Sequence, residues 1–458
     1  MQSSSLPTEI KLFFDSPWAK SMVVRGNPGT GKTAFALTVS SEFAKNGEKV
    51  IYASAIASER QIRNQFPWVN QLSEDLLTIE GGASLPPGTG DQALPMLIFE
   101  FAERKPDLIV IDSWDGFTFQ LTEEEKTKAA RSVREVEREY DGKLLIVCEG
   151  KRVSPLDFTS DSVVLLDTEE LEGRRVRILK IIKMRGLEVR QPRYLFTLAG
   201  ARFKYISRWE WIVKPREARQ KYPPADLSKD RVPTGVDGLD EILGGGWRRG
   251  SVNLFELGRG AGKSYVPFIV NPLRAFLCGG GALVSIPSGA FNPASVVDDL
   301  LVGYVCEDLR RKSAFVYPEI PRLEGEYTLF PPGTATPETY LRALRKAEHA
   351  MRSVSSNGIL MWFLGLDSLE TALGTHGALQ IYYSVAQIVK NRGDIAFAAL
   401  KEGQRLPHYL EHVADTHWKI EEVAGSYVMY GIQPPTPALG IEADYSGPLP
   451  RASVVPIV

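Results

Sequence analysis

Apolar residues in this chain gather in short runs, each followed by a turn and then by a helical pattern. Residues 22–24 and 108–111 are such runs, and residues 34–39 begin a helical pattern after the first turn. Strands that alternate with helices predict parallel βαβ units. A parallel sheet is covered on both faces, which explains why these runs are apolar throughout instead of alternating with polar residues. The pattern predicts an α/β fold with a mainly parallel sheet and helices on both faces.

The same order of elements occurs in each half of the chain, which indicates a duplication. An apolar strand, a glycine-rich turn and Lys-Thr at residues 22–33 recur as a strand, a glycine-rich turn and Lys-Ser at residues 252–264. A strand that ends in Asp-Ser at residues 107–113 likewise recurs at residues 359–368. The chain is therefore expected to hold two tandem domains of one fold.

The segment between the two halves has the composition of a linker. Residues 214–231 carry several prolines among charged residues, a pattern typical of connecting segments. A chain of 458 residues also exceeds what one hydrophobic core normally organises. We therefore expect the first domain at residues 1–213, the linker at 214–231 and the second domain at 232–458.

The glycine-rich turn of the first half has the spacing of a phosphate-binding loop. Its glycines let successive backbone N–H groups converge on phosphate oxygens, and the following helix presents its positive N-terminal end. Lys32 is expected to reach the β and γ phosphates, while the Thr33 hydroxyl and Asp112 are expected to hold Mg²⁺. ATP and Mg²⁺ are therefore the predicted ligands. The residues predicted to bind the nucleotide are Gly26, Asn27, Pro28, Gly29, Thr30, Gly31, Lys32 and Thr33.

The glycine-rich turn of the second half is degenerate, because Leu257 stands where the first half has Gly26. Ser264 and Asp367 are the residues that would hold Mg²⁺ there. Two interpretations stay open: a second nucleotide site, or a loop that was kept for packing after the ligand was lost. The residues that would bind the nucleotide are Gly258, Gly260, Ala261, Gly262, Lys263 and Ser264.

The two halves resemble tandem RecA-fold ATPase domains of the KaiC and RadA (Rad55-like) group. The resemblance is carried by residues 232–246, by the loop and acid of each half, and by the Lys-Met-Arg-Gly sequence at residues 183–186, and it covers nearly the whole chain. The first loop, residues 65–68 and the length of the chain also resemble the archaeal gas-vesicle regulator GvpD and its P-loop relatives. The resemblance implies two RecA-like P-loop domains.

The resemblance also implies a role for Lys183 and Arg185. In the KaiC-like group, a Lys-x-Arg pair on this strand reaches across a subunit boundary to the γ-phosphate of the neighbour. A cation supplied in this way neutralises charge on the transferred phosphoryl group, so the pair would complete a site between protomers of a ring. Taken without the resemblance, two basic residues on an edge strand are a solvated face.

Acidic residues that could activate water are displaced from the positions that the KaiC-like group uses. That group places a glutamate just after the strand at residues 50–54, but residues 55–58 contain no acid and the first one is Glu59. A general base has to lie about 3 Å from its water, so Glu59 serves only if its loop folds back; otherwise it is an acid in the first turn of a helix.

Glu149 and Glu402 follow the strand beside the Mg²⁺-binding acid, where RecA-like proteins place a γ-phosphate sensor. Either one is expected to sense phosphate or orient water, and a turn structure shared by the two halves is the alternative explanation.

Charge and cysteine content limit the remaining classes of function. A net charge of −2 gives no overall basic field that would attract nucleic acid. Cys148, Cys278 and Cys306 have neither the number of a disulfide framework nor the spacing of a zinc site, which favours a reducing cytoplasm. No run of about eighteen apolar residues is present, so no membrane span is expected.

Three functions are consistent with the sequence. The first is a slow ATPase that converts ATP and water to ADP and phosphate and acts as a nucleotide-dependent regulator or assembly switch. The second is a nucleotide-gated regulatory or scaffold protein without turnover, like GvpD. The third is a recombinase-like DNA-binding ATPase, which would need aromatic stacking partners beside a basic loop. Expected partners are ATP and ADP, with further copies of the chain or a regulatory protein. The candidate catalytic residues are Lys32, Glu59, Glu149, Lys183 and Arg185.

Overall fold

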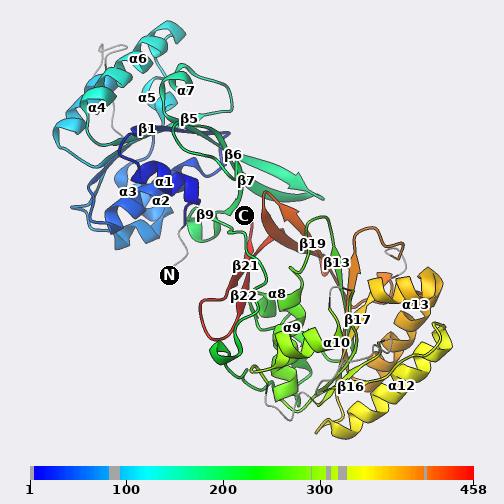
Figure 1. The fold of residues 1–458 in the computed structure, drawn as a ribbon. Helices are drawn as coiled ribbons and strands as arrows, with labels where there is room; N and C mark the ends of the chain where they lie inside the picture. The colour runs from blue at the N-terminus through cyan, green and yellow to red at the C-terminus, as the bar shows by residue number, and fades with distance from the viewer. Residues whose placement is uncertain (1–4, 82–92, 290, 306–310, 318–326, 407–409) are drawn as a thin grey trace. The chain divides into compact units, whose positions relative to one another are not determined.

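The protein divides into two compact units in a computed structural model. The structure describes residues 5–81, 93–289, 291–305, 311–317, 327–406 and 410–458. The first unit comprises Met1–Ser207 together with Pro456–Val458, and the second comprises Arg208–Val455. Each unit is an α/β structure built on one large sheet (Figure 1).

The sheet of the first unit is parallel in its centre and antiparallel at one edge. From β3 to β6 neighbouring strands run parallel, and from β6 to β9 they run antiparallel. The strands in spatial order are β3 (Leu77–Gly81), β2 (Val50–Ser54), β4 (Leu108–Asp112), β5 (Lys143–Glu149), β1 (Ser21–Gly26), β6 (Ser162–Leu171), β7 (Arg174–Met184), β8 (Arg193–Thr197) and β9 (Lys204–Tyr205).

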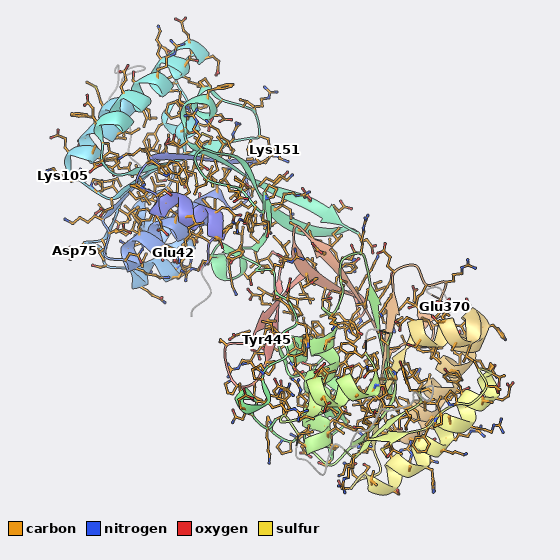
Figure 2. The ribbon with its side chains drawn as sticks, in the orientation of Figure 1. Glu42, Asp75, Lys105, Lys151, Glu370 and Tyr445 are labelled. Atoms are coloured by element: carbon orange, nitrogen blue, oxygen red, sulfur yellow. The ribbon has the colours of Figure 1, made fainter. Side chains whose placement is uncertain are left out.

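Helices cover both faces of this sheet. Met22 and Val24 of β1 pack in one apolar cluster with the helix that follows the phosphate loop, whereas Val23 packs in a second cluster with α4 and α6. Charged side chains such as Asp75 and Lys105 point away from these clusters (Figure 2). The helices are α1 (Thr8–Asp15), α2 (Lys32–Lys45), α3 (Glu59–Gln65), α4 (Ala93–Glu103), α5 (Trp114–Phe117), α6 (Glu123–Glu139) and α7 (Pro155–Thr159).

The second unit repeats this plan with a larger sheet. Its strands run parallel from β19 to β16, and β19, β20 and β21 pair in antiparallel fashion. The strands in spatial order are β11 (Val236–Asp237), β22 (Arg451–Pro456), β21 (Leu439–Asp444), β20 (Ser426–Gln433), β19 (Thr416–Val423), β13 (Ser251–Leu257), β18 (Ile395–Lys401), β17 (Leu360–Gly365), β14 (Ala282–Ile286), β15 (Ser313–Phe315) and β16 (Thr328–Leu329).

Helices also cover both faces of the second sheet. Phe255 and Leu257 of β13 pack with α9, while Val252 and Leu254 pack with α12 and α13. The predicted fold class, α/β with mainly parallel sheets and helices on both faces, is confirmed. The helices are α8 (Leu239–Ile242), α9 (Val266–Cys278), α10 (Pro293–Ser295), a π-helix at Val296–Leu301, α12 (Pro337–Val354) and α13 (Leu366–Arg392).

The segment at residues 214–231, expected to be a linker, packs within the second unit. The Tyr222 N–H donates to the carbonyl of Tyr304 at 2.8 Å, and Arg219 Nη1 donates to the carbonyl of Val302 at 2.7 Å. Arg219 also lies over the Tyr304 ring, 5.2 Å from its centroid. These contacts hold Arg219 and Tyr222 of the segment against the second unit.

No helix among the residues that the structure describes is both long and apolar enough to cross a bilayer. Cys306 lies outside those residues, and Cys148 and Cys278 are free thiols.

Candidate functional site

The phosphate loop of the first unit joins β1 to α2. Gly31 stands before the helix with a φ of +96°, and a Cβ there would lie 2.8 Å from Leu198 Cδ1, so only glycine fits. Gly29 has a φ of +77°, and no atom of the described chain lies within 4 Å of the position that its Cβ would take. The loop therefore presents an open backbone at Gly29 and a closely packed one at Gly31, beside the N-terminus of α2.

Lys32 is held over this loop. Its Nζ donates to the carbonyls of Gly26 at 2.9 Å and Asn27 at 3.1 Å, and to Glu149 Oε2 at 2.9 Å. The Lys32 side chain is 6% exposed, whereas that of Glu149 is 40% exposed. Glu149 lies at the end of β5, in register with Gly26 of β1. The structure thus brings together two of the predicted site residues as an ion pair at the phosphate loop.

Asp112 lies at the end of β4 and accepts two hydrogen bonds on one oxygen. Thr33 Oγ1 donates to Asp112 Oδ2 at 2.8 Å, and the Tyr52 hydroxyl donates to the same oxygen at 2.5 Å. Burial raises the pKa of Asp112, and burial together with the Asp112 charge raises the pKa of Tyr52 well above its ordinary value. The structure therefore brings Thr33 and Asp112 together as predicted from the order of the motifs.

The oxygen donors at this site fit Mg²⁺. A hydroxyl and a carboxylate are hard ligands, and Mg²⁺ is commonly bound by one or two of them while phosphates and water complete the octahedron. Among the described residues, no group of three or more His, Cys, Asp or Glu side chains is arranged as a metal site. Thr33 and Asp112 would hold the ion, and the nucleotide would supply further ligands.

Two residues at the site escaped the sequence analysis. Asp115 of α5 accepts a hydrogen bond from the Glu149 backbone N–H on its Oδ2 at 2.5 Å, so it holds the end of β5. Tyr52 comes from β2, the neighbour of β4. Because Asp115 lies only three residues after the predicted metal-binding Asp112, the sequence could have suggested that Asp115 also lies at this site. Nothing in the sequence around Tyr52 pointed to a contact with the carboxylate.

Glu59 has a partner on its own helix. Its Oε1 accepts a hydrogen bond from Arg63 Nε at 2.8 Å, one turn along α3. Ser58 caps this helix by accepting a hydrogen bond from the Gln61 N–H. The structure therefore places Glu59 in the first turn of a helix, paired with Arg63, and not among the side chains that contact Lys32 or Asp112.

Lys183 and Arg185 contact the carbonyls at the end of α7. Lys183 Nζ donates to the carbonyls of Asp157 at 2.7 Å and Ser160 at 2.5 Å, and Arg185 Nη2 donates to that of Phe158 at 3.2 Å. Lys183 is in register with the beginning of β6, at the edge of the sheet away from the phosphate loop. Within one chain, these two cations are therefore not brought to the Lys32 site.

The second loop is built differently. Helix α9 begins at Val266, whereas α2 begins at the loop lysine itself. Lys263 Nζ lies over the ring of Phe291, 4.7 Å from its centroid. Ser264 Oγ is buried without a hydrogen-bond partner among the described residues, so no hydrogen bond joins it to Asp367.

Asp367 lies in the first turn of α13 and not at the end of a strand. Its Oδ2 accepts hydrogen bonds from Ser288 Oγ at 3.0 Å, from the Gly289 N–H at 3.0 Å and from Lys401 Nζ at 2.5 Å. The structure thus does not assemble Lys263, Ser264 and Asp367 as it assembles their counterparts in the first unit.

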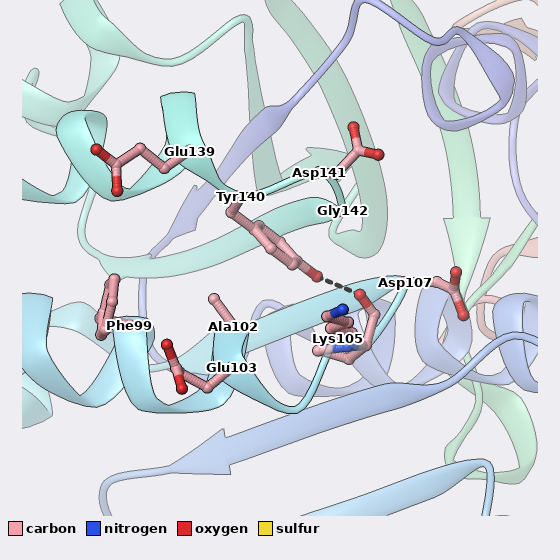
Figure 3. Close-up of a pocket in the computed structure, with 10 residues that line it drawn as sticks. Phe99, Ala102, Glu103, Lys105, Asp107, Glu139, Tyr140, Asp141 and Gly142 are labelled. Carbon is pink, nitrogen blue, oxygen red and sulfur yellow. Dashed lines mark hydrogen bonds between the residues drawn. The ribbon is translucent and has the colours of Figure 1, made fainter.

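A hollow of about 700 Å³ in the first unit lies apart from the phosphate loop. It is lined by the ends of α4 and α6 and by the residues before β4 and β5, including Phe99 and Asp107 (Figure 3). Tyr140 donates a hydrogen bond from its hydroxyl to the Pro106 carbonyl at 2.7 Å across one wall. Asp107 precedes β4 and Asp112 ends it, so this hollow is at the opposite edge of the sheet from the nucleotide site.

Comparison with known proteins agrees with the geometry of the first site. Residues 10–83, which contain the loop and α2, match the family model of the GvpD gas vesicle protein, P-loop domain. Protein GvpD2 of Halobacterium salinarum is 27% identical over 99% of this chain and 96% of its own length. The chain resembles the GvpD proteins from end to end. Protein GvpD1 of the same organism is 23% identical to it over the same shares of both chains.

KaiC proteins resemble part of the chain. The circadian clock oscillator protein KaiC of Prochlorococcus marinus is 25% identical over 58% of this chain and 56% of its own length. A solved KaiC-like protein of Pyrococcus horikoshii is 19% identical, covers 44% of this chain, and has a TM-score of 0.39. The predicted resemblance to the KaiC-like and GvpD-like P-loop proteins is confirmed by the GvpD and KaiC relatives, and these relatives support a nucleotide-binding protein.

Proposed function

We propose that the chain is a nucleotide-dependent regulator that binds ATP with Mg²⁺ in its first unit and hydrolyses it slowly. The observation that supports this most strongly is the pair of contacts at the phosphate loop. Lys32 Nζ lies 2.9 Å from Glu149 Oε2, and Thr33 Oγ1 lies 2.8 Å from Asp112 Oδ2. The cation for the phosphates and the two oxygen donors for the metal are thus held in place by one loop and two neighbouring strands.

Each of these residues has one role in the proposed reaction. Lys32 exchanges its Glu149 partner for phosphate oxygens, which carry more negative charge. Thr33 and Asp112 hold Mg²⁺, which neutralises charge on the β and γ phosphates when it is bound. Glu149, released from Lys32, is then free at the end of β5 to orient the attacking water and accept its proton.

Slow turnover follows from the acids that are present. Asp112 is committed to the metal, and Asp115 is hydrogen-bonded to the Glu149 backbone. Glu59 is paired with Arg63 on α3. Glu149 is therefore the acid of this site that is best placed to act on water, and its carboxylate has to leave Lys32 first.

Binding and hydrolysis measured on three variants test this proposal. Lys32→Ala removes charge-assisted hydrogen bonds of about 1.5–3 kcal/mol, so we expect roughly tenfold to a hundredfold weaker ATP binding. Glu149→Gln is expected to keep ATP affinity while steady-state phosphate release falls about a hundredfold or more. Glu59→Gln is the matched control, and its hydrolysis should equal that of the wild type.

The outcomes separate the alternatives. Loss of hydrolysis in Glu59→Gln but not in Glu149→Gln would assign the water-activating role to Glu59. A wild-type chain that does not bind ATP would contradict the proposal as a whole.

A regulatory or scaffold protein that binds ATP without turnover is the second candidate. It is favoured by the Glu59–Arg63 ion pair and by the lack of acids in residues 55–58. Its ordered state would be held by the γ-phosphate and Mg²⁺. A regulatory protein is the partner that we propose for such a switch. ATP affinity without any phosphate release from the wild type would decide for this candidate.

Assembly into a ring forms part of the proposal for Lys183 and Arg185. To reach the nucleotide of a neighbouring copy, both side chains have to leave the α7 carbonyls that they contact in one chain. We expect light scattering to show a larger assembly with ATP and Mg²⁺ than without them. The double variant Lys183→Ala, Arg185→Ala should assemble less and hydrolyse more slowly. A monomer under both conditions would contradict a role across a subunit boundary.

A further inference from the structure

The strand register shows which residue of the second unit corresponds to Glu149. In the first unit, Gly26 at the start of the phosphate loop is in register with Glu149. In the second unit, Leu257 at the start of the second loop is in register with Lys401. A lysine therefore stands at the strand position where the first unit has its glutamate.

The same register shows what stands in place of Asp112. Asp112 is in register with Val147, two residues before Glu149, and Gly365 is in register with Ala399, two residues before Lys401. A glycine thus takes the place of the metal-binding acid at the end of the strand. The carboxylate of the second unit comes instead from Asp367, in the first turn of α13.

The charge at the strand end that corresponds to Glu149 is consequently reversed in the second unit. In the first unit, the acid at the end of the strand holds the loop lysine. In the second unit, the Lys401 ammonium lies 2.5 Å from Asp367 Oδ2, beside the donors Ser288 Oγ and Gly289 N–H. Lys263 is directed to Phe291 and does not contact this carboxylate, and Ser264 Oγ lacks a hydrogen-bond partner among the described residues. The ammonium balances the carboxylate charge at Oδ2, while Asp367 Oδ1 is buried without a hydrogen-bond partner among the described residues.

The surroundings of the second loop also carry the opposite charge. In the first unit the carbonyl of Gly29 accepts a hydrogen bond from Arg177 Nη1 at 3.0 Å. At Gly260, the counterpart of Gly29, a Cβ would lie only 2.5 Å from Glu422 Oε2. The carboxylate of the exposed Glu422 therefore lies beside the loop, where it adds negative charge next to the place that phosphate oxygens would take. With Lys401 on Asp367 and Glu422 beside Gly260, the second unit does not present the arrangement that fits Mg²⁺ and a nucleotide in the first unit.

We propose that the second unit is a nucleotide-free copy of the phosphate-loop fold in which Lys401 replaces the divalent cation. The ion pair between β18 and α13 holds the end of the sheet without a ligand. The chain then carries one nucleotide, and only the first unit responds to ATP. This inference concerns a different unit from the proposed ATP site.

Counting bound nucleotides in the full chain tests the first half of this inference. Equilibrium dialysis with radiolabelled ATP and Mg²⁺ is expected to give one nucleotide per chain for the wild type and for Lys263→Ala. Lys32→Ala should lose that nucleotide. Two nucleotides per chain, or one that survives Lys32→Ala and is lost in Lys263→Ala, would overturn the inference. A wild type without nucleotide would contradict the proposed ATP site, yet agree with an empty second unit.

Thermal unfolding of a second set of variants tests the role of Lys401. Lys401→Ala leaves the Asp367 carboxylate without its counter-ion and should lower Tm by several degrees. The double variant Lys401→Ala, Asp367→Asn should regain most of this loss. Lys229→Ala is the matched control, because its partner Asp226 is exposed and 3.9 Å away, and its Tm should not change.

Addition of Mg²⁺ without nucleotide distinguishes a cation substitute from an ordinary ion pair. Lys401→Ala should recover part of its Tm in millimolar Mg²⁺, while Lys401→Ala, Asp367→Asn should not respond. An unchanged Tm for Lys401→Ala, or a loss that Mg²⁺ does not relieve, would overturn the assignment of Lys401.

Discussion

The hydrogen bond between Tyr52 and Asp112 is the contact at the first site that depends most on one side chain. Tyr52 is completely buried and donates to the same carboxylate oxygen as Thr33. Buried carboxylates need such donors, because an ionised group taken out of water is unstable without them. Tyr52 therefore stabilises the metal-binding acid in the absence of a metal.

Replacement of Tyr52 by Phe keeps the ring and removes only the donor. We expect the free energy of unfolding of the metal-free chain to fall by about 1.5–3 kcal/mol, the usual size of a hydrogen bond to a charged group. Urea denaturation gives this value directly. Tyr340→Phe is the control, since Tyr340 is buried and burial raises its pKa without a contribution from a hydrogen bond. Equal losses in the two variants would show that the Tyr52 hydroxyl contributes nothing specific.

Sequence alone grouped Lys32, Thr33 and Asp112 in one predicted site, from the spacing within the loop and the acid at a strand end, and the structure joins Thr33 to Asp112 by a hydrogen bond. Tyr52 was missed because its contact depends on the packing of a neighbouring strand. Lys401 was missed for a different reason. The Glu-Gly sequence after each strand suggested Glu402 as the counterpart of Glu149, but the register shifts this by one residue, and a shift of one moves a side chain to the other face.

Caps and strand ends set the limits of the elements, and they were predictable to different degrees. Helix α12 begins at Pro337 after Thr336, whose hydroxyl accepts a hydrogen bond from the Thr339 N–H. The strand before the second Asp-Ser was predicted to reach residue 368, but β17 ends at Gly365 and α13 begins with the next residue. The Asp-Ser dipeptide occurs in both halves, so the sequence did not show that it lies at a strand end in the first half and in a helix in the second.

Asp394 connects three elements of the second unit. It is fully buried, and it accepts hydrogen bonds from Arg352 Nη2 of α12 at 2.7 Å and from the Leu360 N–H and Trp362 Nε1 of β17, both at 3.0 Å. The carboxylate in turn raises the pKa of Arg352 against the opposing effect of burial. One side chain just before β18 thus ties a helix to the strand beside it.

Asp394→Ala should therefore be strongly destabilising. It leaves a mostly buried guanidinium and two buried N–H donors without their acceptor, and removal of one partner from a buried ion pair costs about 3–5 kcal/mol. Chemical denaturation followed by tryptophan fluorescence would measure this loss. Asp226→Ala, at an exposed site, should leave the free energy of unfolding unchanged. A fall in the free energy of unfolding no larger than that of the control variant would contradict the connecting role of Asp394.

At the scale of the whole molecule, two copies of one fold have become chemically unequal. The first has an open loop at Gly29, a lysine paired with Glu149 and an acid for a metal. The second keeps the strand order around its loop, yet a lysine and a glycine stand where the first has its two acids. The duplication was visible in the sequence, whereas this inequality depends on contacts between residues far apart along the chain.

The last three described residues have a consequence for how the two units are connected. Pro456–Val458 belong to the first unit, where Thr197 Oγ1 donates to the Pro456 carbonyl at 2.6 Å, while the preceding residues belong to the second. The polypeptide therefore passes between the units at residue 207 and again at residue 455. A protease that cuts at the first passage would divide the chain into residues 1–207 and 208–458, and the non-covalent contacts of residues 456–458 within the first unit would then hold the two fragments together. Expression of residues 1–213 alone would also remove the acceptor of Thr197.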